Sequence, residues 1–318
     1  MKQASPPIVL QTVPLTPEVD AHLASTYELL PLWKQAEPDR YIEQHGSRCR
    51  AVATAARFGL SSTLMDMLPG LEVVSSFGVG YDTLDLTSIR ARGVQAAYTP
   101  DVLTACVADF AVSLLCATAR RIPQADQFVR GGSWAGASFP LATRIHGKRL
   151  GIVGLGKIGA EIARRAQGFD LEIRYYNRGP SPSSPYAYVP VLRELAEWSD
   201  FLVLSCPGGP ATQHMVDAET LEALGPQGIL INVSRGSVVD HVALIQALKS
   251  GKLGAAGLDV FPEEPLVPPA LLEMDNVVLT PHIGSGSRET RADMAWRVVQ
   301  NLASYFQKGR VDFPIPGS

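Results

Sequence analysis

Residues 149–159 read RLGIVGLGKIG, a short apolar run followed directly by a glycine-rich turn. Gly154, Gly156 and Gly159 have the spacing GxGxxG, and the residues after them have a helix-forming composition. In such a strand–turn–helix unit the glycines allow a tight turn, close approach of the backbone to a pyrophosphate, and close packing of helix on strand. Free N–H groups at the helix start then bind the anion. The motif predicts a dinucleotide site; the alternative is a turn that holds no ligand.

Apolar runs alternate with helix-like segments on both sides of this motif. This rhythm is typical of βαβ units, so we expect an α/β protein with two parallel sheets. The expected strands are 8–13, 27–30, 51–55, 71–75 and 94–98, then 149–153, 171–176, 201–205, 228–233, 254–258 and 276–279.

Two long helical segments suggest where the domains meet. The segment 101–121 has almost no polar face, which indicates a helix buried between two domains. The expected helix 289–307 is followed by too few residues for a further domain. We therefore expect a discontinuous first domain, 1–100 with 289–318, and a dinucleotide-binding domain, 101–288. A Pro- and Ser-rich loop is expected at 179–190.

The composition and charge indicate which broad class of protein to expect. Of the 318 residues, 46% are hydrophobic and 19% charged, as in ordinary globular proteins. A net charge of −3 without long single-sign runs argues against nucleic-acid binding. The N-terminal residues lack the layout of a signal peptide, and the apolar run 102–119 contains Asp109, so neither export nor a membrane span is expected. We expect a cytoplasmic protein.

The four cysteines, Cys49, Cys106, Cys116 and Cys206, lie far apart without a CxxC motif. No His stands at ligand spacing beside them, so we expect reduced thiols and no metal site.

The residues after the second strand of the dinucleotide domain bear on the choice of cofactor. Folds of this type that prefer NAD place Asp or Glu there to bind the ribose hydroxyls. Here the strand ends in Asn177 and Arg178. A carboxylate would repel a 2′-phosphate, whereas an amide and a guanidinium can bind it, so the sequence favours NADP(H). The alternative is that Arg178 is a solvated loop cation.

Three polar residues follow successive apolar strands of this domain. They are Arg235, Glu264 and His282. Residues directly after the strands of a parallel sheet converge on the ligand crevice, so we expect these three side chains near one cleft. Taken singly, each residue also fits a purely structural role, as a surface Arg, a loop Glu, and a helix-capping or core His.

Several longer motifs carry a family resemblance. SRGSVVD (234–240), GAAGLDVFPEEP (254–265), LTPHIGS (279–285), FGVGYDTLDL (77–86) and the segment 99–121 resemble the D-isomer-specific 2-hydroxyacid dehydrogenases. Within that family the chain looks most similar to NADPH-dependent glyoxylate/hydroxypyruvate reductases and hydroxyphenylpyruvate reductases. The resemblance implies a Rossmann nucleotide-binding domain, a flavodoxin-like substrate domain, and a homodimer with the helix near 101–121 at the subunit contact.

The resemblance also implies roles for individual residues. Arg235 is expected to bind the substrate carboxylate, His282 to act as the acid/base, and Glu264 to orient His282. The backbone N–H groups of Val79 and Gly80 are expected to bind the substrate. Expected cofactor contacts are Gly154, Leu155, Gly156, Lys157, Ile158, Gly159, Asn177, Arg178, Cys206, Pro207, Val233, Asp259 and Gly284. Asp259 could equally be a structural turn residue, and Cys206 could be inert core.

The expected activity is NADPH-dependent reduction of a small 2-oxo acid, such as glyoxylate or hydroxypyruvate, to a D-2-hydroxy acid. Hydride would reach C2 from the nicotinamide, and His282 would supply the proton. Arylpyruvates or 2-ketogluconate are alternative substrates. A different class also stays open, because corepressors that share this fold act as dinucleotide-sensing scaffolds rather than as enzymes.

Overall fold

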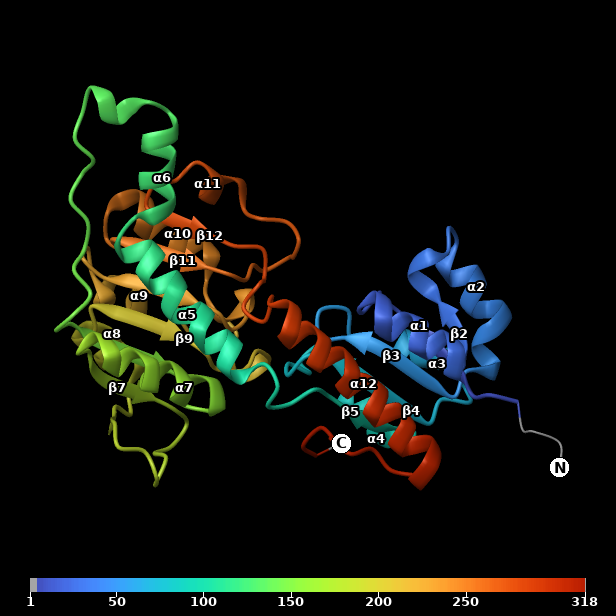
Figure 1. Cartoon of the computed structure of the whole chain (residues 1–318). Helices are drawn as coiled ribbons and strands as arrows, with labels where there is room; N and C mark the ends of the chain where they lie inside the picture. The colour runs from blue at the N-terminus through green and yellow to red at the C-terminus, as the bar shows by residue number, and fades with distance from the viewer. Residues whose placement is uncertain (1–4, 318) are drawn as a thin grey trace. The chain divides into compact units, whose positions relative to one another are not determined.

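The computed structural model describes residues 5–317, which form two compact units, each built on its own parallel sheet (Figure 1). Unit 1 comprises the described residues up to Leu103 together with those from Ser287 onward, and unit 2 comprises Thr104–Gly286. The structure confirms the expected α/β class with two parallel sheets.

Unit 1 has a five-stranded sheet with the order β2-β1-β3-β4-β5. Every pairing is parallel, and the order is that of flavodoxin-like folds. Its strands are β1 (Ile8–Gln11), β2 (Glu28–Pro31), β3 (Ala51–Ala55), β4 (Val73–Phe77) and β5 (Gln95–Ala97). Its helices are α1 (Pro17–Thr26), α2 (Pro38–His45), α3 (Ser62–Asp66), α4 (Leu86–Ala91) and α12 (Arg288–Lys308).

Helix α12 packs across β4 and returns the end of the chain to this sheet (Figure 1). The Ser287 side chain caps its first turn, and the helix ends at Gly309, whose φ of 71° suits a C-terminal stop. Fully buried Asn301 donates to Ser75 Oγ (3.2 Å) and to the Tyr98 carbonyl (3.1 Å). Its Oδ1 accepts from the N–H of Phe313 (3.1 Å). These bonds attach both α12 and the C-terminal segment to the sheet.

Unit 2 has a seven-stranded sheet with the order β12-β11-β10-β9-β6-β7-β8. Counted from β6 as the first strand, this is the Rossmann order 3-2-1-4-5-6 with one more strand at the edge. The strand order reverses between β6 and β9, and ligands of such sheets bind outside the carboxyl ends of the strands at this point. The strands are β6 (Arg149–Val153), β7 (Glu172–Tyr176), β8 (Ala187–Tyr188), β9 (Phe201–Leu204), β10 (Ile229–Asn232), β11 (Ala255–Leu258) and β12 (Val277–Leu279).

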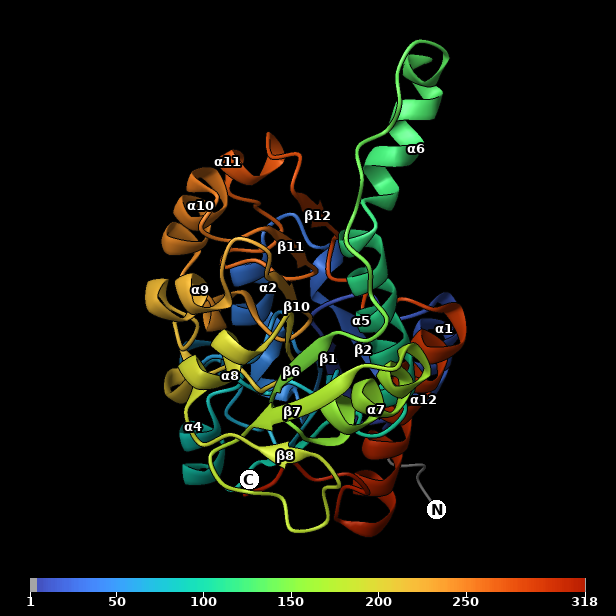
Figure 2. The same cartoon turned by 90° about the vertical axis from the view of Figure 1, so that its left-hand side faces the viewer.

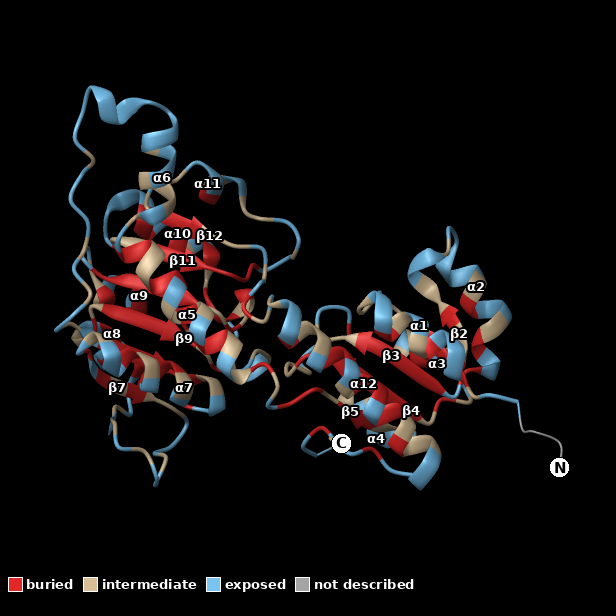
Figure 3. Cartoon of the chain, in the orientation of Figure 1, coloured by how far each residue is buried: buried red, intermediate tan, exposed pale blue. Residues whose placement is uncertain are grey.

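Helices cover both faces of this sheet. Helices α5 and α7 lie on one face and α8, α9 and α10 on the other (Figure 2). The strands between them are buried, as Figure 3 shows. The helices are α5 (Thr104–Ala119), α6 (Ile122–Arg130), α7 (Lys157–Ala166), α8 (Leu192–Trp198), α9 (Ala218–Leu224), α10 (His241–Ser250) and α11 (Pro269–Leu272). Within residues 5–317, no helix is both long and apolar enough for a membrane span.

Two expected segments differ from the structure in detail. The helix expected at 101–121 begins only at Thr104 and ends at Ala119. Asp101 and Arg121 have left-handed φ values of 72° and 53°, so neither can continue an α-helix. The loop expected at 179–190 contains the short strand β8, which pairs with β7, while Tyr188 packs on Tyr175 with ring centroids 5.5 Å apart.

Candidate active site

The glycine-rich turn joins β6 to α7 at the switch point of the unit 2 sheet. Gly154 has a φ of +97°, and a Cβ there would lie 2.6 Å from Cys206 Cα, so only glycine fits. A Cβ on Gly156 would meet no atom within 4 Å, which leaves its backbone open to a ligand. Within residues 5–317 no side chain caps the start of α7, and an uncapped helix start of this kind suits an anion. The turn therefore fits the pyrophosphate of a dinucleotide.

The side chain of Asn177 is tied to this turn. Its Oδ1 accepts a hydrogen bond from the N–H of Leu155 at 2.8 Å. Because the oxygen is committed to the turn, the group that Asn177 can offer to a ligand is its NH₂ donor. Arg178 follows as an exposed residue. A donor and a cation thus stand where an NAD-preferring fold has a carboxylate.

Buried Asn232, at the end of β10, shapes the turn that carries Arg235. Its Oδ1 accepts from the N–H and the hydroxyl of Ser234, at 3.0 and 2.8 Å. Its Nδ2 donates to the Arg235 carbonyl at 3.0 Å. The Arg235 side chain is half-buried, and its Nη1 donates to the Ser234 carbonyl at 2.9 Å. Asn232 was not among the residues predicted from the sequence, although its place at the end of a strand, shortly before Ser234 and Arg235, is a signal for such a role.

Glu264 and His282 form a close pair. His282 Nδ1 lies 2.7 Å from Glu264 Oε2, and Glu264 Oε1 accepts from the N–H of Phe261 at 3.2 Å. Burial alone would raise the pKa of Glu264, but the His282 hydrogen bond and charge, the Phe261 N–H and the Arg235 charge together lower it. The carboxylate is therefore ionised at neutral pH. Because it engages Nδ1, His282 Nε2 is the ring nitrogen left for a substrate.

The carboxylate of Asp259 holds the turn on which His282 stands. Its Oδ1 accepts from Thr280 Oγ1 (2.7 Å) and the Ile283 N–H (2.8 Å), and its Oδ2 accepts from the Gly284 N–H (2.8 Å). His282 has a left-handed φ of 54°, a conformation that needs support from its surroundings. Burial raises the pKa of Asp259, while these three donors and the His282 charge oppose the rise. These contacts fit a turn-holding role for Asp259, and its contact with the cofactor stays a prediction.

The other expected cofactor residues of unit 2 also border this edge of the sheet. Cys206 and Pro207 follow β9, and Val233 follows β10. Burial raises the pKa of the Cys206 thiol to about 11, so it is neutral and gives no sign of chemistry. The backbone of Gly284 is held by Asp259, as described above, and Lys157 and Ile158 begin α7.

Val79 and Gly80 belong to unit 1. They follow β4 at the carboxyl end of that unit's sheet and are half-buried. They stay candidate substrate contacts on the sequence argument.

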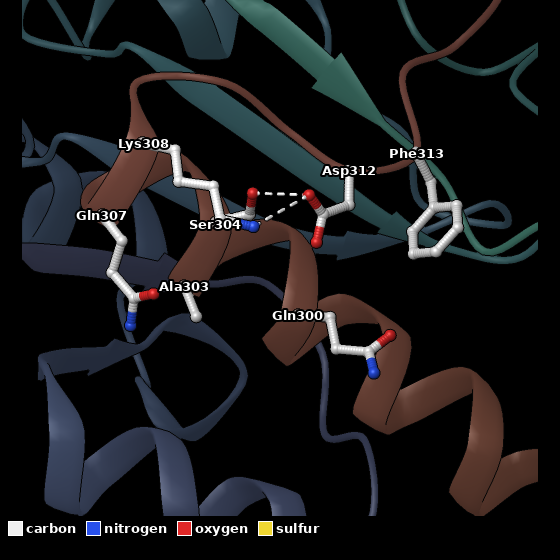
Figure 4. A pocket seen from close by; sticks show the side chains of 7 residues that line it. All are labelled: Gln300, Ala303, Ser304, Gln307, Lys308, Asp312 and Phe313. Carbon is white, nitrogen blue, oxygen red and sulfur yellow. Dashed lines mark hydrogen bonds and ion pairs between the residues drawn. The ribbon is translucent and has the colours of Figure 1, made fainter.

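Two pockets outlined by side chains lie elsewhere. One, of about 300 Å³, is formed in unit 1 by the last turns of α12 and the segment after it (Figure 4). Asp312 in this pocket is already bonded to Ser304 (2.7 Å) and Lys308 (3.5 Å). It contains none of the predicted site residues. Among residues 5–317, no three His, Cys, Asp or Glu side chains gather as a metal ion would require.

Comparison with known families identifies the family of this chain. Residues 112–284 match the family described as D-isomer specific 2-hydroxyacid dehydrogenase, NAD binding domain. The chain belongs to this family. The resemblance expected from the sequence motifs is confirmed, and the matched span includes the glycine-rich turn and the Glu264–His282 pair.

Curated relatives cover nearly all of the dehydrogenase chain. It is 45% identical over 298 residues to hydroxyphenylpyruvate reductase of Plectranthus scutellarioides and to glyoxylate/hydroxypyruvate reductase A of Arabidopsis thaliana. Both alignments include 94% of this chain and 95% of the relative.

One solved structure is similar to this chain over nearly its whole length. The NADPH-dependent glyoxylate/hydroxypyruvate reductase of Sinorhizobium meliloti, in complex with NADP and malonate, matches with a TM-score of 0.90 and 40% identity. The match covers 98% of this dehydrogenase and 97% of that chain.

Proposed function

We propose that this dehydrogenase reduces a small 2-oxo acid, with glyoxylate and hydroxypyruvate as the first candidates, to the D-2-hydroxy acid with NADPH. The observation that carries the proposal is the 2.7 Å contact between Glu264 and His282, on the sheet edge that also bears the dinucleotide turn. The names of the 45% identical reductases and of the NADPH-dependent structural relative support the same substrate class and cofactor.

In the proposed reaction each residue has one task. The Arg235 guanidinium binds the substrate carboxylate through two parallel hydrogen bonds. Reduced nicotinamide, when bound, supplies a hydride to C2. His282 gives the proton on Nε2 to the carbonyl oxygen as negative charge develops there, and ionised Glu264 stabilises the protonated ring. Hydride and proton together reduce the ketone or aldehyde to the alcohol.

The preference for NADPH rests on Asn177 and Arg178. Removal of Arg178 takes away a charge-assisted contact to the 2′-phosphate, which NADH lacks. Arg178→Ala is therefore expected to raise KM for NADPH about tenfold or more and to leave KM for NADH nearly unchanged. The measurement is oxidation of each cofactor with a panel of glyoxylate, hydroxypyruvate, an arylpyruvate and 2-ketogluconate, ranked by kcat/KM.

Arg193→Ala is the matched control, because Arg193 is an exposed arginine on α8. An unchanged NADPH/NADH ratio in Arg178→Ala would contradict the assigned cofactor contact. A wild-type protein that reduces none of the four acids would contradict the enzymatic function and favour the scaffold alternative.

We further propose a homodimer. Four large apolar side chains are exposed on α6 and the segment after it: Ile122 (53%), Val129 (52%), Trp134 (69%) and Leu141 (99%). This segment stands away from the unit 2 sheet and is exposed over most of its length (Figures 2 and 3). Exposed apolar surface of this kind is typical of protein interfaces.

Sedimentation at micromolar concentration is expected to give twice the mass of one chain. Trp134→Ser combined with Leu141→Ser is expected to shift the protein toward monomer, while Trp33→Ser, which changes an exposed Trp of unit 1, is not. A monomeric wild type would refute the dimer.

A further inference from the structure

The loop after β4 in unit 1 is held by one buried threonine. Thr99 is fully buried, and its Oγ1 accepts from the Gly78 N–H at 2.9 Å and lies 3.1 Å from the Gly78 carbonyl oxygen. The backbone N–H of Thr99 donates to the same carbonyl at 2.9 Å. Both polar backbone groups of Gly78 are therefore bound to a single residue.

Gly78 needs such support because its backbone is unusual. Its φ of +135° is reached freely only by glycine, and a Cβ at this position would lie 2.7 Å from the Ala56 Cβ. A glycine has no side chain with which to fix its own conformation. The external bonds from Thr99 supply that restraint.

The restraint extends to the next residue through the peptide bond. The Gly78 carbonyl and the Val79 N–H belong to one planar trans peptide group, so they point in opposite directions. Fixing the carbonyl toward Thr99 therefore fixes the Val79 N–H away from Thr99. Val79 is one of the two residues whose backbone N–H groups are candidates for binding the substrate carboxylate.

We infer that Thr99 is a positioning residue for substrate binding, which sets the plane of the Gly78–Val79 peptide and hence the direction of the Val79 N–H. It does not touch the substrate. The inference rests on the proposed function, since it concerns how a 2-oxo acid carboxylate is bound. It adds a residue to which the sequence motifs assigned no role.

Thr99→Val keeps the shape of the side chain and removes the hydroxyl. We expect KM for the best 2-oxo acid, and the inhibition constant of the non-reacting analogue oxamate, to rise about tenfold. The value of kcat and KM for NADPH should change less than about twofold, because the change affects ground-state binding of the carboxylate. Thr99→Ser retains the hydroxyl and should behave like the wild type.

A second measurement does not depend on activity. Amide hydrogen exchange of the segment 77–81 in the free protein is expected to be faster in Thr99→Val than in the wild type or in Thr99→Ser. Thr118→Val is the matched control, since Thr118 is another buried threonine and its hydroxyl donates to the Leu114 carbonyl of its own helix. If Thr99→Val does not fold, Thr99→Ala is used in its place.

The outcomes separate the two proposals. An active wild type whose Thr99→Val variant has an unchanged KM and unchanged exchange overturns the positioning role. A Thr99→Ser variant as impaired as Thr99→Val also overturns it, because the hydroxyl would then not be the essential group. A wild type without activity on any of the four acids overturns the proposed function instead, while the exchange measurement still tests the restraint on the peptide.

Discussion

Replacement of His282 by alanine is expected to lower kcat for 2-oxo acid reduction about a hundredfold or more, because general acid catalysis contributes roughly 10² to 10⁴ in rate. In the structure Nδ1 is committed to Glu264 at 2.7 Å, so one nitrogen, Nε2, is left to donate the proton. KM for NADPH should change little, since the phosphate turn lies on different strands of the sheet. Steady-state kinetics over a range of pH is the measurement.

The companion variant Glu264→Gln separates charge from hydrogen bonding. The pKa of Glu264 is lowered, so the carboxylate is ionised through the neutral range, and glutamine keeps the shape while removing that charge. Without the charge the protonated His282 ring loses its counterion, and the upper pH limit for reduction should move to lower pH. A His282→Ala enzyme with near-normal kcat would refute the assignment of the acid, and an unshifted pH profile in Glu264→Gln would leave Glu264 a structural role.

Much of the architecture could be predicted from the sequence because buried parallel strands are apolar and follow one another at regular spacing. Of the twelve strands in residues 5–317, eleven lie within or overlap expected ranges, and one of these, 149–153, was expected from the glycine motif itself. Strand β8 was missed, since two residues in a Pro- and Ser-rich segment carry no periodicity and their pairing depends on β7. Helix α1 was also missed, although Thr16 and Pro17 are a helix-start signal.

The positions of the side chains in the candidate active site were more predictable from the sequence than their hydrogen bonds. Residues that follow parallel strands converge, which was enough to expect Glu264 and His282 together. The left-handed φ of His282 and the three donors on Asp259 depend on the shape of one turn, and nothing in residue spacing indicates them. Thr99 was equally hidden, because its partner Gly78 lies 21 residues away.

A buried histidine behind the Arg235 turn is a further group that spacing did not single out. His241 begins α10, and neither of its ring nitrogens has a hydrogen-bond partner among the described residues. Burial lowers its pKa from 6.5 to about 4; the Gly236 backbone and the Asp240 charge oppose this, and His214 adds to it. Gly236 itself is packed so tightly that a Cβ would lie 2.0 Å from the Phe261 carbonyl carbon. The native fold thus holds a neutral imidazole next to the turn that carries Arg235.

The native protein should therefore lose stability in mild acid. The unfolded chain binds a proton at His241 below pH 6.5, whereas the folded chain binds it only below about pH 4. The stability contributed by the neutral ring is therefore complete above pH 6.5 and falls as the pH decreases to about 4. Between about pH 7.5 and pH 5 this loss amounts to about 2 kcal/mol in the free energy of unfolding.

His241→Leu removes the titrating group and is expected to abolish that part of the loss, as measured by urea unfolding at the two pH values. His146→Leu, which changes an exposed histidine of the same unit, should keep the wild-type dependence on pH. At neutral pH His241→Leu should be no less stable than the wild type, because leucine buries no unpartnered polar atom. An equal loss of stability in wild type and His241→Leu would mean that the native structure accepts the proton on His241, and that the ring is less enclosed than its contacts indicate.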